Sequence, residues 1–98
     1  MFVATLELDV LLGDVHSLKE KRGLLRPVIA DLRRHHEVAA AEAGLQDLHR
    51  RSLIGVAVVS SDPGHCTAVL DSCERLVAER PELDLLSARR TLRDTDDE

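Results

Sequence analysis

Aromatic side chains are almost absent from this chain of 98 residues. Phe2 is the one aromatic residue, and there is neither Trp nor Tyr. Sheet-based RNA-binding modules stack unpaired bases on aromatic side chains, so stacking recognition is disfavoured. The core must also be aliphatic, because Val, Leu, Ile and Ala supply most of the apolar surface.

Long apolar runs are missing as well. No stretch approaches the 18 or so residues that a membrane-spanning helix needs. Glu7 and Asp9 lie near the start with no basic leader, which predicts that there is no signal peptide. A charged fraction of 32% and a formal net charge of −5 are typical of a soluble protein. The length predicts one domain, and we expect a cytoplasmic location with no membrane partner.

The chain has only two cysteines, Cys66 and Cys73. Seven residues of helix separate their Cα atoms by about 10.5 Å, whereas a disulfide needs roughly 4.4–6.8 Å. They cannot bridge each other, and no C-x-x-C spacing indicates a redox or metal site. We expect two reduced thiols buried on the apolar side of a helix.

Catalytic and metal-binding signatures are missing too. The five histidines have no zinc-ligand spacing, and "SSDPGH" lacks the lysine and glycines of a phosphate loop. We therefore predict no enzyme activity, metal or cofactor. One polar cluster, Glu42, Gln46, Asp47 and His49, contains groups capable of acid–base chemistry. Local hydrogen bonds that hold the loop are the favoured interpretation.

Four segments have the pattern of β-strands. Residues 2–12 alternate apolar and polar side chains, which predicts a half-buried strand. "SLIGVAVVSS" (52–61) is β-branched and continuous, as in a central strand. Weaker patterns predict strands at 38–43 and 82–92, and in the last one either Leu85 or Leu86 points inward.

Two segments have helical patterns. Ser17 and Glu20 form a capping box that opens a helix running to about His36. Asp62 and Pro63 open a second helix, as N-cap and first residue, which ends before Pro81. The apolar stripe of the first helix consists of Leu18, Leu25, Val28, Ile29 and Leu32. The stripe of the second consists of Cys66, Val69, Leu70, Cys73, Leu76 and Val77.

The order β-α-β-β-α-β predicts an α+β, ferredoxin-like domain over residues 1–92. Right-handed crossovers place both helices on one face of a four-stranded antiparallel sheet. The acidic segment "RDTDDE" (93–98) is expected to be a disordered tail.

Three motifs resemble the YlxP-like family of small bacterial proteins: "HSLKEKR", "AEAGLQDLHRR" and "LIGVAVVSSD". The resemblance covers residues 2–92, and His49 stands where the family commonly has tryptophan. It implies a ferredoxin-like fold and no known activity. YlxP-like proteins are often encoded beside transcription and translation factors, including ribosome-binding factor A, which implies work on RNA or the ribosome.

The first predicted helix is basic in an acidic chain. Residues 16–36 hold six Lys or Arg and two acidic side chains. Lys19, Arg22 and Arg26 fall with Arg33 within about 60° on a helical wheel. We consider a solvated face and a site for a phosphate backbone. The candidate nucleic-acid-binding residues are Lys19, Lys21, Arg22, Arg26, Arg33, Arg50 and Arg51.

The sheet face opposite the helices is the second candidate surface. Its expected centre is small and flat, with Glu7 and Asp9 towards one end, where they would repel phosphate. Such a face suits packing against another copy of the chain. The candidate interface residues are Val3, Thr5, Gly55, Ala57 and Val59.

The sequence therefore leaves two functional hypotheses. The first is a non-enzymatic binding module for ribosomal RNA or a ribosomal particle, using the basic side of the first helix. The alternative is a self-associating structural or regulatory protein, such as a homodimer, that binds a protein through the open sheet face.

Overall fold

The computed structural model describes residues 1–96. These residues form four strands and two helices in the order β-α-β-β-α-β. Their bounds are β1 Phe2–Leu12, α1 Leu18–His35, β2 Ala39–Gly44, β3 Arg51–Ser60, α2 Pro63–Ala78 and β4 Leu83–Asp94. No helix in the described part of the chain is both long and apolar enough to cross a membrane.

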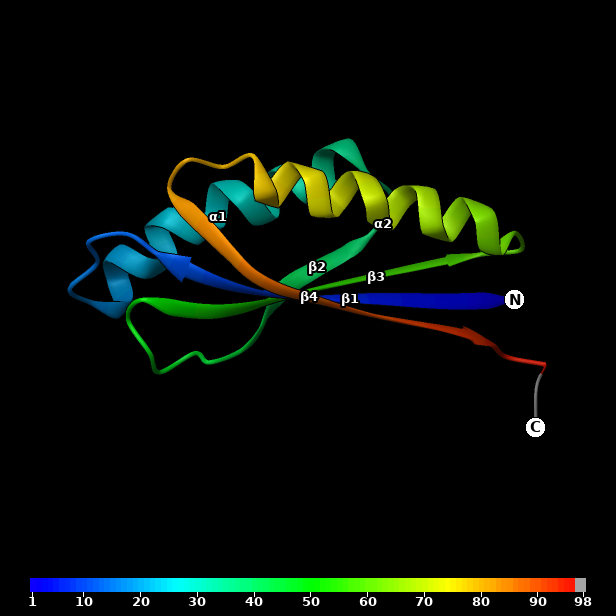
Figure 1. The fold of residues 1–98 in the computed structure, drawn as a ribbon, viewed down its shortest axis with the longest axis horizontal. Coiled ribbons are helices and arrows are strands. Elements are labelled where there is room, and N and C mark those ends of the chain that lie inside the picture. The colour runs from blue at the N-terminus through cyan, green and yellow to red at the C-terminus, as the bar shows by residue number, and fades with distance from the viewer. Residues whose placement is uncertain (97–98) are drawn as a thin grey trace.

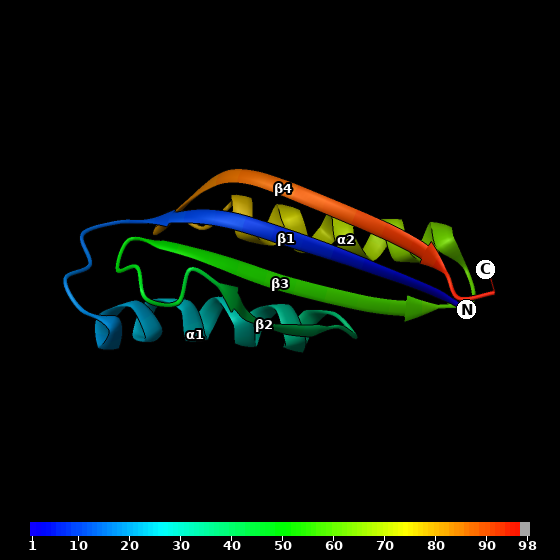
Figure 2. The same cartoon turned by 90° about the horizontal axis from the view of Figure 1, so that it is seen from below.

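The strands form one antiparallel sheet in the order β2-β3-β1-β4. Figure 1 shows both helices on the same side of the sheet. Seen from below, the sheet lies in front, with α1 along the β2 side and α2 behind β1 and β4 (Figure 2). The predicted ferredoxin-like arrangement is confirmed, and β3 is a central strand, as its continuous apolar sequence indicated.

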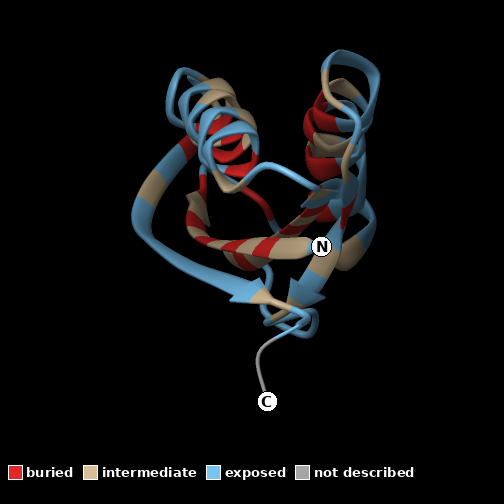
Figure 3. Cartoon of the chain, turned by 90° about the vertical axis from the view of Figure 1, so that its right-hand side faces the viewer, coloured by how far each residue is buried: buried red, intermediate tan, exposed pale blue. Residues whose placement is uncertain are grey.

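The core lies between the helices and the sheet. Along β1, every even-numbered residue from Ala4 to Leu12 is buried, because alternate side chains of a strand point to opposite faces. Val56 and Val58 of β3 alternate in the same way. Figure 3 shows these buried positions as a striped pattern on the strands that faces the inner sides of both helices.

Both helices begin at the predicted caps. The Ser17 hydroxyl oxygen accepts a hydrogen bond from the Glu20 amide at 3.1 Å, and Asp62 Oδ1 accepts one from the Gly64 amide at 2.9 Å. Pro27 lies inside α1 but is exposed, so the carbonyl that loses its amide partner is on the solvent side, where water can replace the donor.

Cys66 and Cys73 are free thiols and fully buried, as their place on the apolar stripe of α2 predicted. Burial raises the pKa of the Cys73 thiol to about 11, because the thiolate would lose its hydration, and the charge of Arg90 opposes this only in part. Cys73 is therefore a neutral thiol at pH 7 and behaves as a small apolar side chain.

β4 differs from the expected strand at both ends. A bulge adds Leu86 opposite the step from Asp9 to Val10. As a result Leu85 packs against the core while Leu86 is 49% exposed, which resolves the ambiguity between the two leucines.

The predicted start of the disordered tail, at residue 93, was placed too early, because β4 continues beyond it. Arg93 and Asp94 belong to β4, pairing with Val3 and Phe2. The Thr95 amide then donates to the Met1 carbonyl at 2.9 Å. Pairing with the full length of β1 extends the strand through this polar segment, and residues 97–98 lie outside the described part.

Candidate functional site

The basic side of α1 is exposed. Lys19, Arg22 and Arg26 project into solvent on one side of the helix, as their spacing predicted. Arg33 continues the row in the last turn of α1, and its Nη2 donates to the carbonyl oxygen of Ala40 in β2. We refer to Lys19, Arg22, Arg26 and Arg33 as the basic stripe.

The basic stripe differs from most cations of the chain in having no acidic partner. Six other cationic side chains lie within 4.0 Å of a carboxylate: Lys21, Arg34, Arg51, Arg80, Arg89 and Arg90. Within residues 1–96, no carboxylate lies that close to any member of the stripe. Its charge is therefore available to an external anion.

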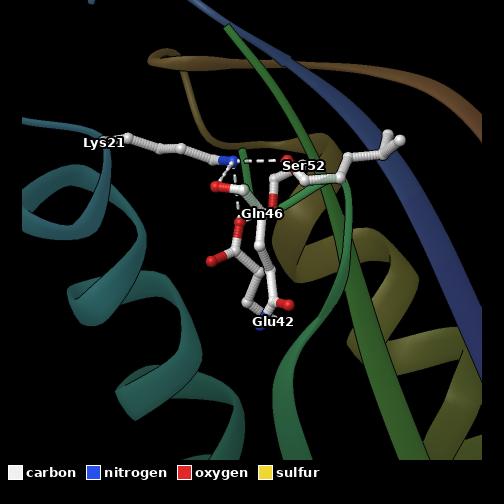
Figure 4. Close-up of polar contacts among 5 residues, drawn as sticks. Lys21, Glu42, Gln46 and Ser52 are labelled. Atoms are coloured by element: carbon white, nitrogen blue, oxygen red, sulfur yellow. Dashed lines mark hydrogen bonds and ion pairs between the residues drawn. The ribbon is translucent and has the colours of Figure 1, made fainter. Parts of the chain in front are cut away.

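Lys21 was predicted to join this surface, and that prediction is wrong. Its side chain is only 1% exposed and points inward from α1 (Figure 4). Lys21 Nζ lies 2.9 Å from Glu42 Oε2 and donates to the carbonyl oxygens of Leu45 at 2.7 Å and Gln46 at 3.4 Å. A buried ammonium needs such partners because it has lost its water.

The helical pattern contained the signal for this burial. At 100° per residue, Lys21 lies between Leu18 and Val28 on the wheel, inside the apolar stripe and not beside it. The number of charges in the segment does not reveal this position, because it ignores the direction in which each side chain points. The partner Glu42 lies on the helix-facing side of β2, two residues from buried Ala40.

The contacts of Lys21 join two of the motifs that carry the family resemblance. Lys21 belongs to "HSLKEKR", whereas Glu42, Leu45 and Gln46 belong to "AEAGLQDLHRR". Ser52, which is fully buried, donates from its hydroxyl to Glu42 Oε2 at 2.7 Å. Leu45, at φ 56°, starts the turn of residues 45–50 that these bonds hold against α1.

The proposed acid–base cluster does not assemble. Glu42 points toward α1 and is occupied by Lys21 and Ser52, while Asp47 and His49 are exposed in the loop. The favoured interpretation was local hydrogen bonds that hold the loop, but the partners of Glu42, Lys21 and Ser52, lie 21 and 10 residues away in the sequence. Among residues 1–96, no three His, Cys, Asp or Glu side chains form a metal-binding group.

Arg50 and Arg51 do not extend the basic stripe. Arg50 Nε donates to the carbonyl oxygens of Leu12 at 3.3 Å and Gly13 at 2.9 Å, which ties the loop to the end of β1. Arg51 makes a two-bond pair with Asp9, at 3.1 and 2.7 Å. Arg51 is thus paired with an acid. Arg50, like Arg33, donates only to backbone carbonyl oxygens, and it is set apart from the stripe because it lies in the loop before β3 and not on α1.

The open sheet face has the small centre that was predicted. Thr5 lies across from Ala57, which in turn lies across from Ala39, and Val3 pairs with Val59, which is 59% exposed. Thr5, Ala39 and Ala57 border a shallow apolar hollow of about 590 Å³ over β1, β3 and β2. No segment of residues 1–96 covers this face (Figure 2).

Glu7 and Asp9 were expected to be free acids towards one end of this face, but both are paired with arginines. Arg89 Nη2 bonds to Glu7 at 2.7 Å, and Arg51 pairs with Asp9. Their charges are neutralised within the sheet, because cross-strand neighbours of opposite charge attract one another.

A bulge in the neighbouring strand β2 explains why residue 55 is a glycine. A register shift leaves Ala43 as an extra residue opposite β3. A Cβ atom at position 55 would lie 2.9 Å from the Cβ of Ala43, which is closer than two methyl groups can pack. The glycine is therefore required by the bulge, whether or not a partner binds this face.

A second hollow follows the outer side of β2. It has a volume of about 520 Å³ and lies between α1 and the edge strand. Its lining residues are Arg26, Ile29, Ala30, Arg33, Ala41 and Glu42. Two members of the basic stripe thus border a mainly apolar groove.

Comparison with known proteins agrees with this structure. A de novo designed protein with a ferredoxin fold, solved by NMR, matches with a TM-score of 0.56 at 12% identity, covering 99% of this chain and 89% of that chain. An uncharacterized protein, YlxP of Bacillus subtilis (strain 168), is 30% identical over 78 residues, which are 80% of this chain and 85% of that protein.

The family comparison supports the same relationship. The model of the family described as "Protein of unknown function (DUF503)" matches residues 3–90. Together with the similarity to YlxP, this confirms the family resemblance inferred from the three motifs. The chain therefore belongs to the DUF503 family of proteins of unknown function.

Proposed function

We propose that the chain is a non-enzymatic binding module of the cytoplasm that holds the phosphate backbone of RNA along the basic stripe. The observation that carries this proposal is the row of exposed cations on α1 without acidic partners. The resemblance to YlxP-like proteins, which are often encoded beside ribosome-binding factor A, makes ribosomal RNA or a ribosomal particle the preferred partner.

The charge distribution supports an anion on α1 in particular. The chain has a net charge of −5, so the molecule as a whole repels RNA and attraction must come from a local surface. Arginine donors form strong, charge-assisted hydrogen bonds with phosphate oxygens. Binding of this kind releases condensed counterions and therefore weakens as salt is added.

Salt dependence tests the proposal. With four phosphate contacts, the logarithm of the binding constant for a labelled ribosomal RNA fragment should fall against log salt with a slope of about −3 to −4. Affinity should drop roughly 100-fold between 50 and 200 mM salt. Arg22→Ala combined with Arg26→Ala should reduce the slope by about 2. Fluorescence anisotropy measures both effects.

A matched control removes the same charge elsewhere. Arg75 and Arg93 are exposed, and neither has a carboxylate within 4.0 Å in residues 1–96. Arg75→Ala combined with Arg93→Ala should keep most of the affinity and the slope. Equal losses in the two double variants, with folding intact in both, would show that the stripe is not the binding site.

The open sheet face supports a second candidate function, self-association as a homodimer. The observation in its favour is the uncovered apolar hollow bordered by Thr5, Ala39 and Ala57. Side chains this small let a second sheet approach closely. Two identical faces related by a twofold axis would bury each other's apolar surface.

Ala57→Arg should turn such a dimer into a monomer. The long charged side chain would project from the middle of the hollow and hold two faces apart. Light scattering over a concentration series measures the mass, and Ala68→Arg on the exposed side of α2 is the control. A monomer at every concentration, or a dimer that Ala57→Arg leaves intact, would contradict this candidate.

A further inference from the structure

We infer that the RNA taken by the basic stripe is base-paired and is bound without regard to its sequence. This inference rests on the proposed function and specifies its ligand. Three features of residues 1–96 carry it: the lack of a stacking surface, the lack of side chains that can reach the base edges of an RNA duplex, and the apolar groove beside α1.

Residues 1–96 offer no surface on which unpaired bases could stack. The one aromatic residue, Phe2, is partly buried and packs against the core. Proteins that hold single strands gain much of their affinity from the stacking of successive bases on aromatic side chains. Without it, a flexible single strand would have to be ordered by phosphate contacts alone.

The stripe also lacks the amide side chains that read adenine, and its lysine and arginines could read guanine only through the major groove. Its four members are all cations, the sequence contains no asparagine, and the single glutamine, Gln46, lies in the loop after β2. Contacts from cations to phosphates position a nucleic acid but carry no sequence information. The deep, narrow major groove of an RNA duplex moreover keeps arginines away from the base edges.

The length and rigidity of the stripe suit a rigid, densely charged partner. From Lys19 to Arg33 the helix rises about 21 Å. A nucleic-acid duplex presents roughly one charge per 1.7 Å of its axis, twice the density of one strand. Cations fixed on one helix therefore meet more phosphates on a duplex, and neither partner has to be ordered first.

The groove beside the stripe fits a ridge of sugar and phosphate. Ile29, Ala30 and Ala41 form its apolar lining, and Arg26 and Arg33 border it. Its one carboxylate, Glu42, is paired with Lys21. Duplex RNA is recognised by its shape and by contacts to ribose and phosphate across a wide, shallow minor groove. One strand of the duplex would lie in the groove, with the two arginines on its phosphates.

The test compares labelled RNA probes by anisotropy on the full chain. Two duplexes of about 20 base pairs, with unrelated sequences, are compared with an unpaired RNA of about 20 nucleotides. Each probe is longer than the row of cations on α1. We expect both duplexes to bind alike, about tenfold more tightly than the single strand. The Arg22→Ala, Arg26→Ala variant should lose this preference, whereas the Arg75→Ala, Arg93→Ala variant should keep it.

The contrary outcomes separate the two levels of the proposal. A single strand that binds as tightly as a duplex, or duplexes that differ by about tenfold or more, would overturn this inference and leave RNA binding in place. Poly-glutamate that displaces duplex RNA at an equal charge concentration would point to an acidic protein partner and overturn it too. If no RNA binds at low salt, the proposed function itself fails.

Discussion

Replacing Glu42 by alanine should lower the free energy of unfolding by about 3–5 kcal/mol, as expected when one partner of a buried ion pair is removed. The reason is the position of Lys21, whose ammonium is almost fully buried and 2.9 Å from the carboxylate. The variant leaves a buried positive charge with only two carbonyl acceptors. It also removes the acceptor of the Ser52 hydroxyl. Urea denaturation, monitored by circular dichroism, measures the change.

The double variant Lys21→Met, Glu42→Leu separates the charge from the packing. Apolar residues of similar volume often replace a buried ion pair without loss of stability, so the double variant should be more stable than Glu42→Ala. The carbonyl of Leu45 would lose its donor, which limits the recovery by about 1–3 kcal/mol. If Glu42→Ala changed stability by less than about 1 kcal/mol, the pair would have to be solvated in solution.

Leu70→Ala should lower the free energy of unfolding by about 2–5 kcal/mol, the range for large-to-small changes in a well-packed core. Leu70 is 2% exposed, in the buried cluster that also contains Cys66 and Cys73. The surrounding residues belong to different elements and cannot all collapse into the space left by the side chain. Because small domains have only about 5–15 kcal/mol of stability, thermal denaturation should reveal a marginal protein.

Leu86→Ala is the matched control for this change. Leu86 is the same residue type but is 49% exposed at the bulge of β4, so its truncation should alter stability by about 0.5 kcal/mol or less. Equal effects of the two substitutions would contradict the assignment of Leu70 to the core and of Leu86 to the surface.

The sequence by itself determined the order of elements and most of their bounds. The period-2 alternation of residues 2–12 specified which side of β1 is buried, because each strand residue points away from its neighbours. Ser17 and Asp62 marked the starts of both helices, because their side-chain oxygens accept bonds from nearby amides. These are local effects, so they are visible in the sequence alone. The exposed side of α1 with Lys19, Arg22 and Arg26 followed from helical spacing in the same way.

The tertiary structure decided which charges are paired. The helical wheel places Lys21 among apolar residues, but only the fold brings Glu42, 21 residues away, to its ammonium. Glu7 and Arg89 come together through the register of β1 and β4. The bulges at Ala43 and Leu86 depend on the partner strand in the same way. Such pairing depends on which residues are close in space, and the spacing of residues along the chain does not specify this. For that reason the basic surface was predicted as seven residues, and the fold reduces it to the four of the basic stripe.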